Sequence, residues 1–127
     1  MYEPYLTSDE YYMNGGRNID GDNIKRFLIS ASRHIDTLTF NRIVAKGFEN
    51  LTEFQQEIVK QVCFDMANFE FENEDFLNSI VKSYSVNGVS MQFGEGINVA
   101  IVNGVAIKRD TYNLLTQTGL CYRGLRR

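Results

Sequence analysis

The 127-residue chain is poor in several residue types that mark particular protein classes: it has no Trp, one Pro, one His and two Cys. Cys63 and Cys121 lack the paired spacing of a disulfide framework or a zinc site. No apolar run approaches the roughly 20 residues that a membrane-spanning helix needs. The first residues also lack a basic segment followed by an apolar one, so we expect no signal peptide, no membrane contact and a cytoplasmic protein.

Residues for catalysis or metal binding are equally scarce. His34 lies at the edge of an apolar helical stripe, so a structural role is expected for it. The thiol of Cys121, next to Arg123, could have a lowered pKa, but no base is paired with it. A calcium loop starting at Asp20 fails, because its sixth position is Lys25 and its twelfth is Ala31. We therefore expect no enzyme, no metal and no cofactor.

What the chain does have is enough apolar and aromatic side chains for one domain over residues 1–127: 43% are hydrophobic, with nine Phe and seven Tyr. The clearest helix is predicted at residues 23–38, with Asp22 as its N-cap and Asp36 among its solvent-facing residues. Its apolar positions recur at helical spacing and form one stripe: Ile24, Phe27, Leu28, Ala31, Ile35 and Leu38.

Further helices are indicated by capping residues. Thr7 starts a helix of one or two turns that ends at residues 14–16, and Thr39 caps a short helix over residues 40–46 that Gly47 ends. The apolar residues of this helix and just after it, Phe40, Ile43, Val44 and Phe48, are expected to turn the chain toward the core. Thr52 and Gln55 form a capping box for a helix that reaches residue 68 or 71, with an apolar arc that includes Phe54.

Two aromatic residues of this helix, Phe64 and Phe71, fall on its charged face, seven residues apart. They are either a second packing surface or a contact for another subunit, provided that the helix reaches Phe71.

Beyond residue 73 the period changes. Another helix is expected from Glu74, and Asn87-Gly88 between alternating apolar residues predicts a β-hairpin at about residues 83–93. Residues 97–107, around Asn103-Gly104, form either another hairpin or an extended connector. A last helix is predicted over residues 109–118, followed by a flexible tail, residues 119–127. The expected fold is mainly α: a small helical bundle with one β-hairpin and a C-terminal helix plus tail.

Charge is unevenly distributed, although the net charge is only -3. Residues 49–75 carry eight acids and one Lys, whereas the chain from residue 108 onward carries five basic residues and one acid. These regions are either two solvated faces or complementary surfaces of neighbouring subunits.

The order of these elements resembles that of the head-tail connector (adaptor) proteins of long-tailed bacteriophages and prophages. The specific parts of the resemblance are the segment Ile35-Asp36, Thr39 and Arg42-Ile43, and the terminus Gly119-Leu120-Cys121-Tyr122-Arg123-Gly124-Leu125. The resemblance implies a non-enzymatic structural protein that docks as a ring beneath the portal. Such a ring extends the DNA channel and receives the next tail-side connector or stopper protein.

From this resemblance we expect self-association into a ring, a portal partner, and packaged DNA that only passes through the channel. The protein would be in the host cytoplasm during assembly and then in the virion, at the head-tail joint. The candidate partner-binding residues are Phe64, Phe71, Leu120, Tyr122, Arg123, Leu125, Arg126 and Arg127.

Two alternatives remain. A DNA-binding regulator would also join helices by short turns, but no predicted helix has a dense Lys/Arg face and the net charge is negative. A generic protein-interaction module of phage origin is the other alternative, and only its partners would distinguish it from a connector.

Overall fold

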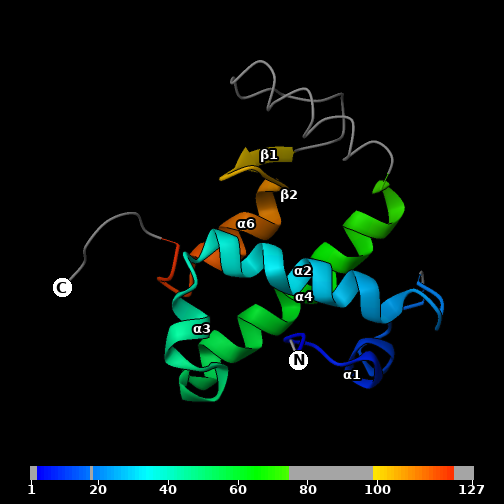
Figure 1. The fold of residues 1–127 in the computed structure, drawn as a ribbon, viewed down its shortest axis with the longest axis horizontal. Coiled ribbons are helices and arrows are strands. Elements are labelled where there is room, and N and C mark those ends of the chain that lie inside the picture. Colours follow the sequence, from blue (N-terminus) through cyan, green and yellow to red (C-terminus); the bar gives the residue numbers. More distant parts are fainter. Residues whose placement is uncertain (1–2, 18, 75–98, 122–127) are drawn as a thin grey trace.

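The computed structural model describes residues 3–17, 19–74 and 99–121, and these residues are mainly helical (Figure 1). The helices α1 (Ser8–Met13), α2 (Ile24–Leu38), α3 (Arg42–Lys46) and α4 (Glu53–Glu72) follow one another, with a 3₁₀ turn (Phe48–Asn50) before α4. The strands β1 (Val99–Val102) and β2 (Val105–Lys108) and the helix α6 (Arg109–Thr116) come last. The predicted fold class, mainly α with one β-hairpin, is confirmed.

The strands β1 and β2 form a β-hairpin. Of the two alternatives for residues 97–107, a hairpin or an extended connector, the hairpin is therefore the one present. The strands are antiparallel and Val102 pairs with Val105, so Asn103 and Gly104 are the two turn residues. Both have positive φ, +52° and +82°, as a two-residue hairpin turn of this hand requires, and Asn and Gly tolerate that conformation best. The hairpin predicted at about residues 83–93 and the helix predicted after Glu74 lie outside the described residues.

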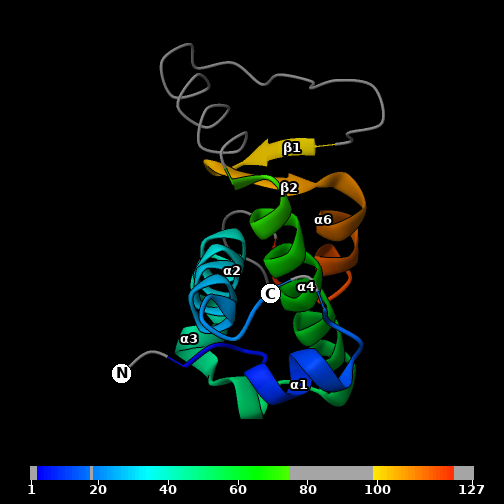
Figure 2. The ribbon, with the colours of Figure 1, turned by 90° about the vertical axis from the view of Figure 1, so that its right-hand side faces the viewer.

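The core lies between α2 and α4, which pack against each other. The helix α6 packs against the other side of α4, beneath the hairpin (Figure 2). The predicted stripe of α2 is confirmed, since each of its six apolar residues is at most 4% exposed. Val59, Val62, Cys63 and Met66 of α4 face it, and Leu115 of α6 and Ile107 of β2 join the same buried cluster.

The predicted capping box of Thr52 and Gln55 is present, and Thr7, predicted as an N-cap, forms a second capping box with Glu10. The hydroxyl of Thr7 accepts a hydrogen bond from the Glu10 amide, and that of Thr52 accepts one from the Gln55 amide. The side chains of Glu10 and Gln55 accept in turn from the backbone amides of Thr7 and Thr52. These boxes satisfy amides that the first turn of a helix leaves unpaired, which explains where α1 and α4 begin.

Three predicted details of α2 are wrong. Asp22 is not the N-cap: the cap position is Asn23, and the carboxylate of Asp20 accepts from the Asn23 amide at 3.0 Å. Asp36 is not on the solvent side, because it is 6% exposed and accepts a hydrogen bond from the hydroxyl of Tyr5. Thr39 does not cap α3; it is the C-cap of α2, and its hydroxyl donates to the Ile35 carbonyl at 2.8 Å.

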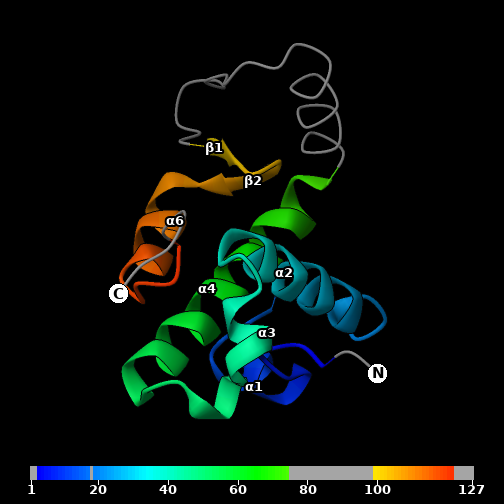
Figure 3. The same ribbon diagram turned by 60° about the vertical axis from the view of Figure 1, so that its left-hand side comes forward.

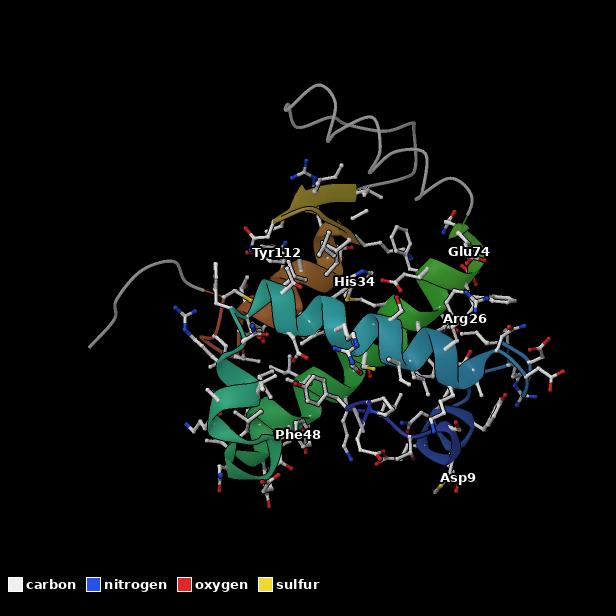
Figure 4. The ribbon with its side chains drawn as sticks, in the orientation of Figure 1. Asp9, Arg26, His34, Phe48, Glu74 and Tyr112 are labelled. Atoms are coloured by element: carbon white, nitrogen blue, oxygen red, sulfur yellow. The ribbon has the colours of Figure 1, made fainter. Side chains whose placement is uncertain are left out.

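Polar side chains hold neighbouring segments to α2. The amide of Tyr5 donates to Ser32 Oγ at 2.9 Å, and the Tyr5 ring stacks on Phe48 with centroids 5.3 Å apart. At the other end of α2, Arg26 pairs with Glu74 at 3.0 Å (Figure 4). The N-terminal segment is thus fixed to the C-terminal half of α2, and Glu74, which follows α4, is fixed to the first turn of α2.

Candidate assembly surface

The turn that joins α2 to α3 has an unusual backbone. Phe40 and Asn41 both have positive φ, +57° and +60°, in a region that non-glycine residues rarely occupy. Backbone hydrogen bonds hold the turn, since the Asn41 amide donates to the Asp36 carbonyl at 2.8 Å and the Arg42 amide to Thr39 at 3.1 Å. This backbone leaves the Phe40 ring 39% exposed, beside the Arg42 guanidinium at 5.0 Å.

Arg42 also connects this turn to the end of the described chain. Its Nη1 donates to the carbonyl oxygen of Leu120 at 2.9 Å. From α4, Gln55 Nε2 donates to the carbonyl oxygen of Thr118, also at 2.9 Å. Side chains from two elements therefore hold residues 118–120 in place.

The prediction of a flexible tail over residues 119–127 is wrong for its first residues, 119–121. Leu120 and Cys121 are partly buried and pack against the hydrophobic core, so residues 119–121 are part of the folded body. Gly119 has a φ of +76°, which agrees with its predicted role in ending the last helix. The other predicted partner-binding residues of the tail, Tyr122, Arg123, Leu125, Arg126 and Arg127, lie outside the described residues.

The lowered thiol pKa suggested for Cys121 is also wrong. Burial raises the pKa of the Cys121 thiol to about 11, although the positive charge of Arg42 opposes that rise. Burial raises the pKa of the Cys63 thiol further, to about 12, against the hydrogen bond with Ser32. Neither thiol has the lowered pKa of a catalytic nucleophile.

Phe64 and Phe71 have aromatic neighbours within the chain. The helix α4 extends to Glu72 and therefore includes both Phe64 and Phe71. The Phe64 ring lies 5.1 Å from that of Tyr11 in α1, and the Phe71 ring lies edge-on to that of Phe27 in α2 at 5.4 Å. Both rings are half-buried, so packing within the chain explains why each aromatic residue is on the charged side of α4. Phe71 is therefore not part of the proposed interface between subunits.

Three other large apolar side chains are exposed where the sequence pattern predicted burial. They are Phe40, Val44 and Phe54, and their exposed fractions are 39%, 58% and 56%. One signal could have identified Phe54: it shares a stripe of α4 with the exposed Glu57 and Gln61 at positions i, i+3 and i+7. Phe40 and Val44 carried no such signal, because the backbone of the α2–α3 turn determines their orientation.

A shallow groove of about 360 Å³ adjoins the Phe54 stripe. It is lined by Asn14 at the end of α1 and, on α4, by Glu57, Lys60, Gln61 and Phe64. Lys60 pairs there with Glu10 of α1 at 2.5 Å, and this hydrogen bond holds the pKa of the Glu10 carboxyl below its usual value. The groove therefore has a half-buried aromatic ring among polar walls.

The acidic region that begins at Glu49 does not form one face. Glu49, Glu53, Glu57, Glu72 and Glu74 are exposed, but Glu70 is 7% exposed and points toward α2. Its carboxylate accepts from Ser30 Oγ at 2.9 Å and lies 2.5 Å from His34 Nδ1. Burial lowers the pKa of His34, but the hydrogen bond and charge of Glu70 outweigh burial, so this pKa lies above its usual value. His34 thus has the structural contact expected of it.

No helix within residues 3–17, 19–74 and 99–121 is long and apolar enough to cross a membrane. Over the same ranges, no three side chains of His, Cys, Asp or Glu are grouped so that they could hold a metal ion. No protein-family model matches the chain, and neither a curated protein nor a solved structure matches it. The function is therefore inferred from the sequence pattern and from the contacts between the described residues.

Proposed function

We propose that this chain is a structural protein of the head-tail joint of a long-tailed bacteriophage or prophage. In this role it docks as a ring beneath the portal, extends the channel through which packaged DNA passes, and receives the next tail-side connector or stopper protein. It acts in the host cytoplasm during assembly and afterwards in the virion. It performs no catalysis.

The observation that carries this proposal is a contact between the two segments on which the resemblance depends. Residues 35–43 and residues 119–125 are far apart in sequence, yet Arg42 of the first donates to the Leu120 carbonyl of the second. Burial of Cys121 next to the charge of Arg42 is a second sign of the same contact. These two segments carry the resemblance to the connector family, and they are in contact in the fold. This contact supports a common role for them.

The position of this contact also suits a connector. The predicted portal-binding residues, Tyr122, Arg123 and those that follow, come directly after Cys121, which packs on the body of the protein. Because the chain is fixed up to that point, residues 122–127 begin from a defined place on each subunit. An ordered ring of subunits would then present them to the portal at regular intervals.

Electron microscopy of lysates from a phage or prophage that lacks this gene tests the proposal. We expect filled or leaking heads beside separate, finished tails, and joined particles once the gene is supplied on a plasmid. Joined particles in the absence of the gene would contradict the proposal.

A truncated chain refines this test. It ends at Cys121, because removing Leu120 or Cys121 would also disturb the core. We expect residues 1–121 to fold, as judged by circular dichroism, but not to restore joined particles. Full restoration by the truncated chain would exclude residues 122–127 from portal docking.

A further inference from the structure

Two exposed apolar surfaces of this chain have different shapes and different charges around them. The turn surface consists of Phe40, Val44 and Ala45 with the basic Arg42 and Lys46, and it projects from the α2–α3 turn. The groove surface consists of Phe54 and the adjoining groove lined by Glu57, Lys60, Gln61 and Phe64, with Glu53 beside it. Exposed apolar side chains rimmed by polar groups are typical of interaction sites.

We propose that the turn surface of one copy of this chain binds the groove surface of a second copy. The Phe40 ring and the Val44 side chain of one subunit would enter the groove between α1 and α4 of the next, where Phe64 is half-buried. This inference deepens the proposed function and rests on it, because it assigns the two surfaces that would form the ring.

Shape supports this pairing. Two consecutive residues with positive φ, a conformation that is unfavourable for Phe, present Phe40 to solvent and not to the core. The backbone of the turn is held by hydrogen bonds, so the ring is presented on a rigid support. Interface residues that contribute most to affinity are often aromatic side chains that fill a pocket on the partner, and Phe40 is an exposed aromatic side chain on such a support.

Charge supports it as well. Arg42 lies beside Phe40, and the exposed Lys46 is one helical turn after Arg42 on the same side of α3, although the exposed Glu49 follows Lys46 by three residues. The groove surface has two exposed acids, Glu53 and Glu57, while its Lys60 is already paired with Glu10. An interface between these surfaces brings opposite charges together, which favours this pairing over contact of either surface with itself.

The geometry of the two surfaces makes the contact heterologous. The turn surface belongs to α3 and the turn before it, and the groove surface to α4 and the end of α1. Figure 3 shows α1, α3 and the start of α4 at the same end of the molecule. By helical periodicity, the stripe of α4 that contains Phe54, Glu57 and Gln61 is on the side opposite its buried core residues, whereas α3 follows the end of α2. A contact between two different patches propagates from subunit to subunit and can close into a ring.

Two complementary variants test the pairing in the isolated full chain. Val44→Glu disables only the turn surface, and Phe54→Asp disables only the groove surface; an Asp in the first turn of a helix also suits its dipole. Asn113→Glu on α6 adds the same charge to an exposed position elsewhere and is the control. All chains are compared by analytical ultracentrifugation at about 0.1–1 mM, where weak interfaces are populated.

We expect the unmodified chain and the Asn113→Glu control to self-associate and each surface variant alone to remain monomeric. An equimolar mixture of Val44→Glu and Phe54→Asp retains one intact surface of each kind, so it should form dimers and nothing larger. A monomeric unmodified chain, self-association of either variant alone, or a mixture without dimers would each overturn the pairing.

A charge exchange tests the orientation. Lys46→Glu should weaken self-association at least about tenfold, and adding Glu57→Lys to the same chain should restore most of it. Failure of the second change to restore association would contradict contact between these residues. These measurements use purified protein, so their failure leaves the head-tail proposal, which is tested on particles, to be judged separately.

Discussion

At the scale of single residues, the pair of His34 and Glu70 is the clearest electrostatic feature of the core boundary. Their side chains are 40% and 9% exposed, and Ser30 donates a further hydrogen bond to the same carboxylate. Ser30 and His34 come from α2 and Glu70 from α4. The pair therefore supplies a polar contact between the two helices that form most of the core.

This pair predicts a pH dependence of stability. Because the pKa of His34 is raised in the folded state, the folded chain binds the proton more tightly than the unfolded chain. The stabilisation is fully present below the unfolded pKa of about 6.5 and is lost as pH rises through the folded pKa. Since this is the only His in the chain, an NMR titration of its ring should give a pKa above 6.5 directly.

Glu70→Gln is the matched control for that titration. It keeps the size of the side chain but removes the charge that raises the His34 pKa, so burial then dominates. We expect the pKa of His34 to fall below its usual value in this variant, so the pH dependence should reverse: stability should then be lost as pH falls through the unfolded pKa. An unchanged titration would show that Glu70 does not interact with the imidazole in solution.

At the scale of elements, helix ends and turns determine the paths of the helices. The capping boxes at Thr7 and Thr52 start α1 and α4, and the Asn103-Gly104 turn joins β1 to β2. Each is a local signal that needs only a few neighbouring residues. The helix start at Thr7 and the Thr52 capping box are present as predicted, whereas the hairpin at Asn103-Gly104 was one of two alternatives. The α2–α3 turn differs, because Phe40 is not a residue that favours positive φ.

The cap of α4 gives a prediction at this scale. Thr52→Ala removes the side chain that accepts from the Gln55 amide, and it should lower the free energy of unfolding by about 1 kcal/mol. Thr52→Ser retains the hydroxyl and should cost clearly less. Chemical denaturation of the three chains measures the difference, and an equal loss in both variants would mean that the hydroxyl does not act as a cap.

At the scale of the whole molecule, the chain after α6 is fixed to elements far away in sequence. Gln55 holds Thr118 and Arg42 holds Leu120, so residues 118–121 lie against both α3 and α4. The same region joins the turn surface to the point from which residues 122–127 begin. A change in Arg42 should therefore be detected at the end of the described chain.

Arg42→Ala tests that connection. Loss of the hydrogen bond to Leu120 should release residues 118–121, and release would end the burial that raises the pKa of Cys121. We expect iodoacetamide to modify Cys121 at least about tenfold faster in this variant at pH 8, while the fully buried Cys63 stays unreactive. Mass spectrometry separates the two sites.

The control for this experiment is Arg26→Ala, which also removes an Arg, in this case from α2 and not from α3. Arg26 pairs with Glu74 at the surface, where both side chains are about half exposed, so its loss should change stability by no more than about 1 kcal/mol. Cys121 should react at the same rate as in the unmodified chain. A faster reaction in the control would indicate general destabilisation and not release of residues 118–121.

The sequence by itself determined the features that depend on near neighbours along the chain: the cap at Thr7, the capping box at Thr52, the apolar stripe of α2 and the last helix. Periodicity and capping residues act within a few positions, so they can be recognised in one sequence. The tertiary structure decided which side chains meet. It buried Asp36 and Glu70 by giving them Tyr5, Ser30 and His34 as partners, and it held Leu120 with Arg42. It also exposed Phe40 and Val44, because the backbone of one turn, and not the hydrophobicity of its residues, determines their direction.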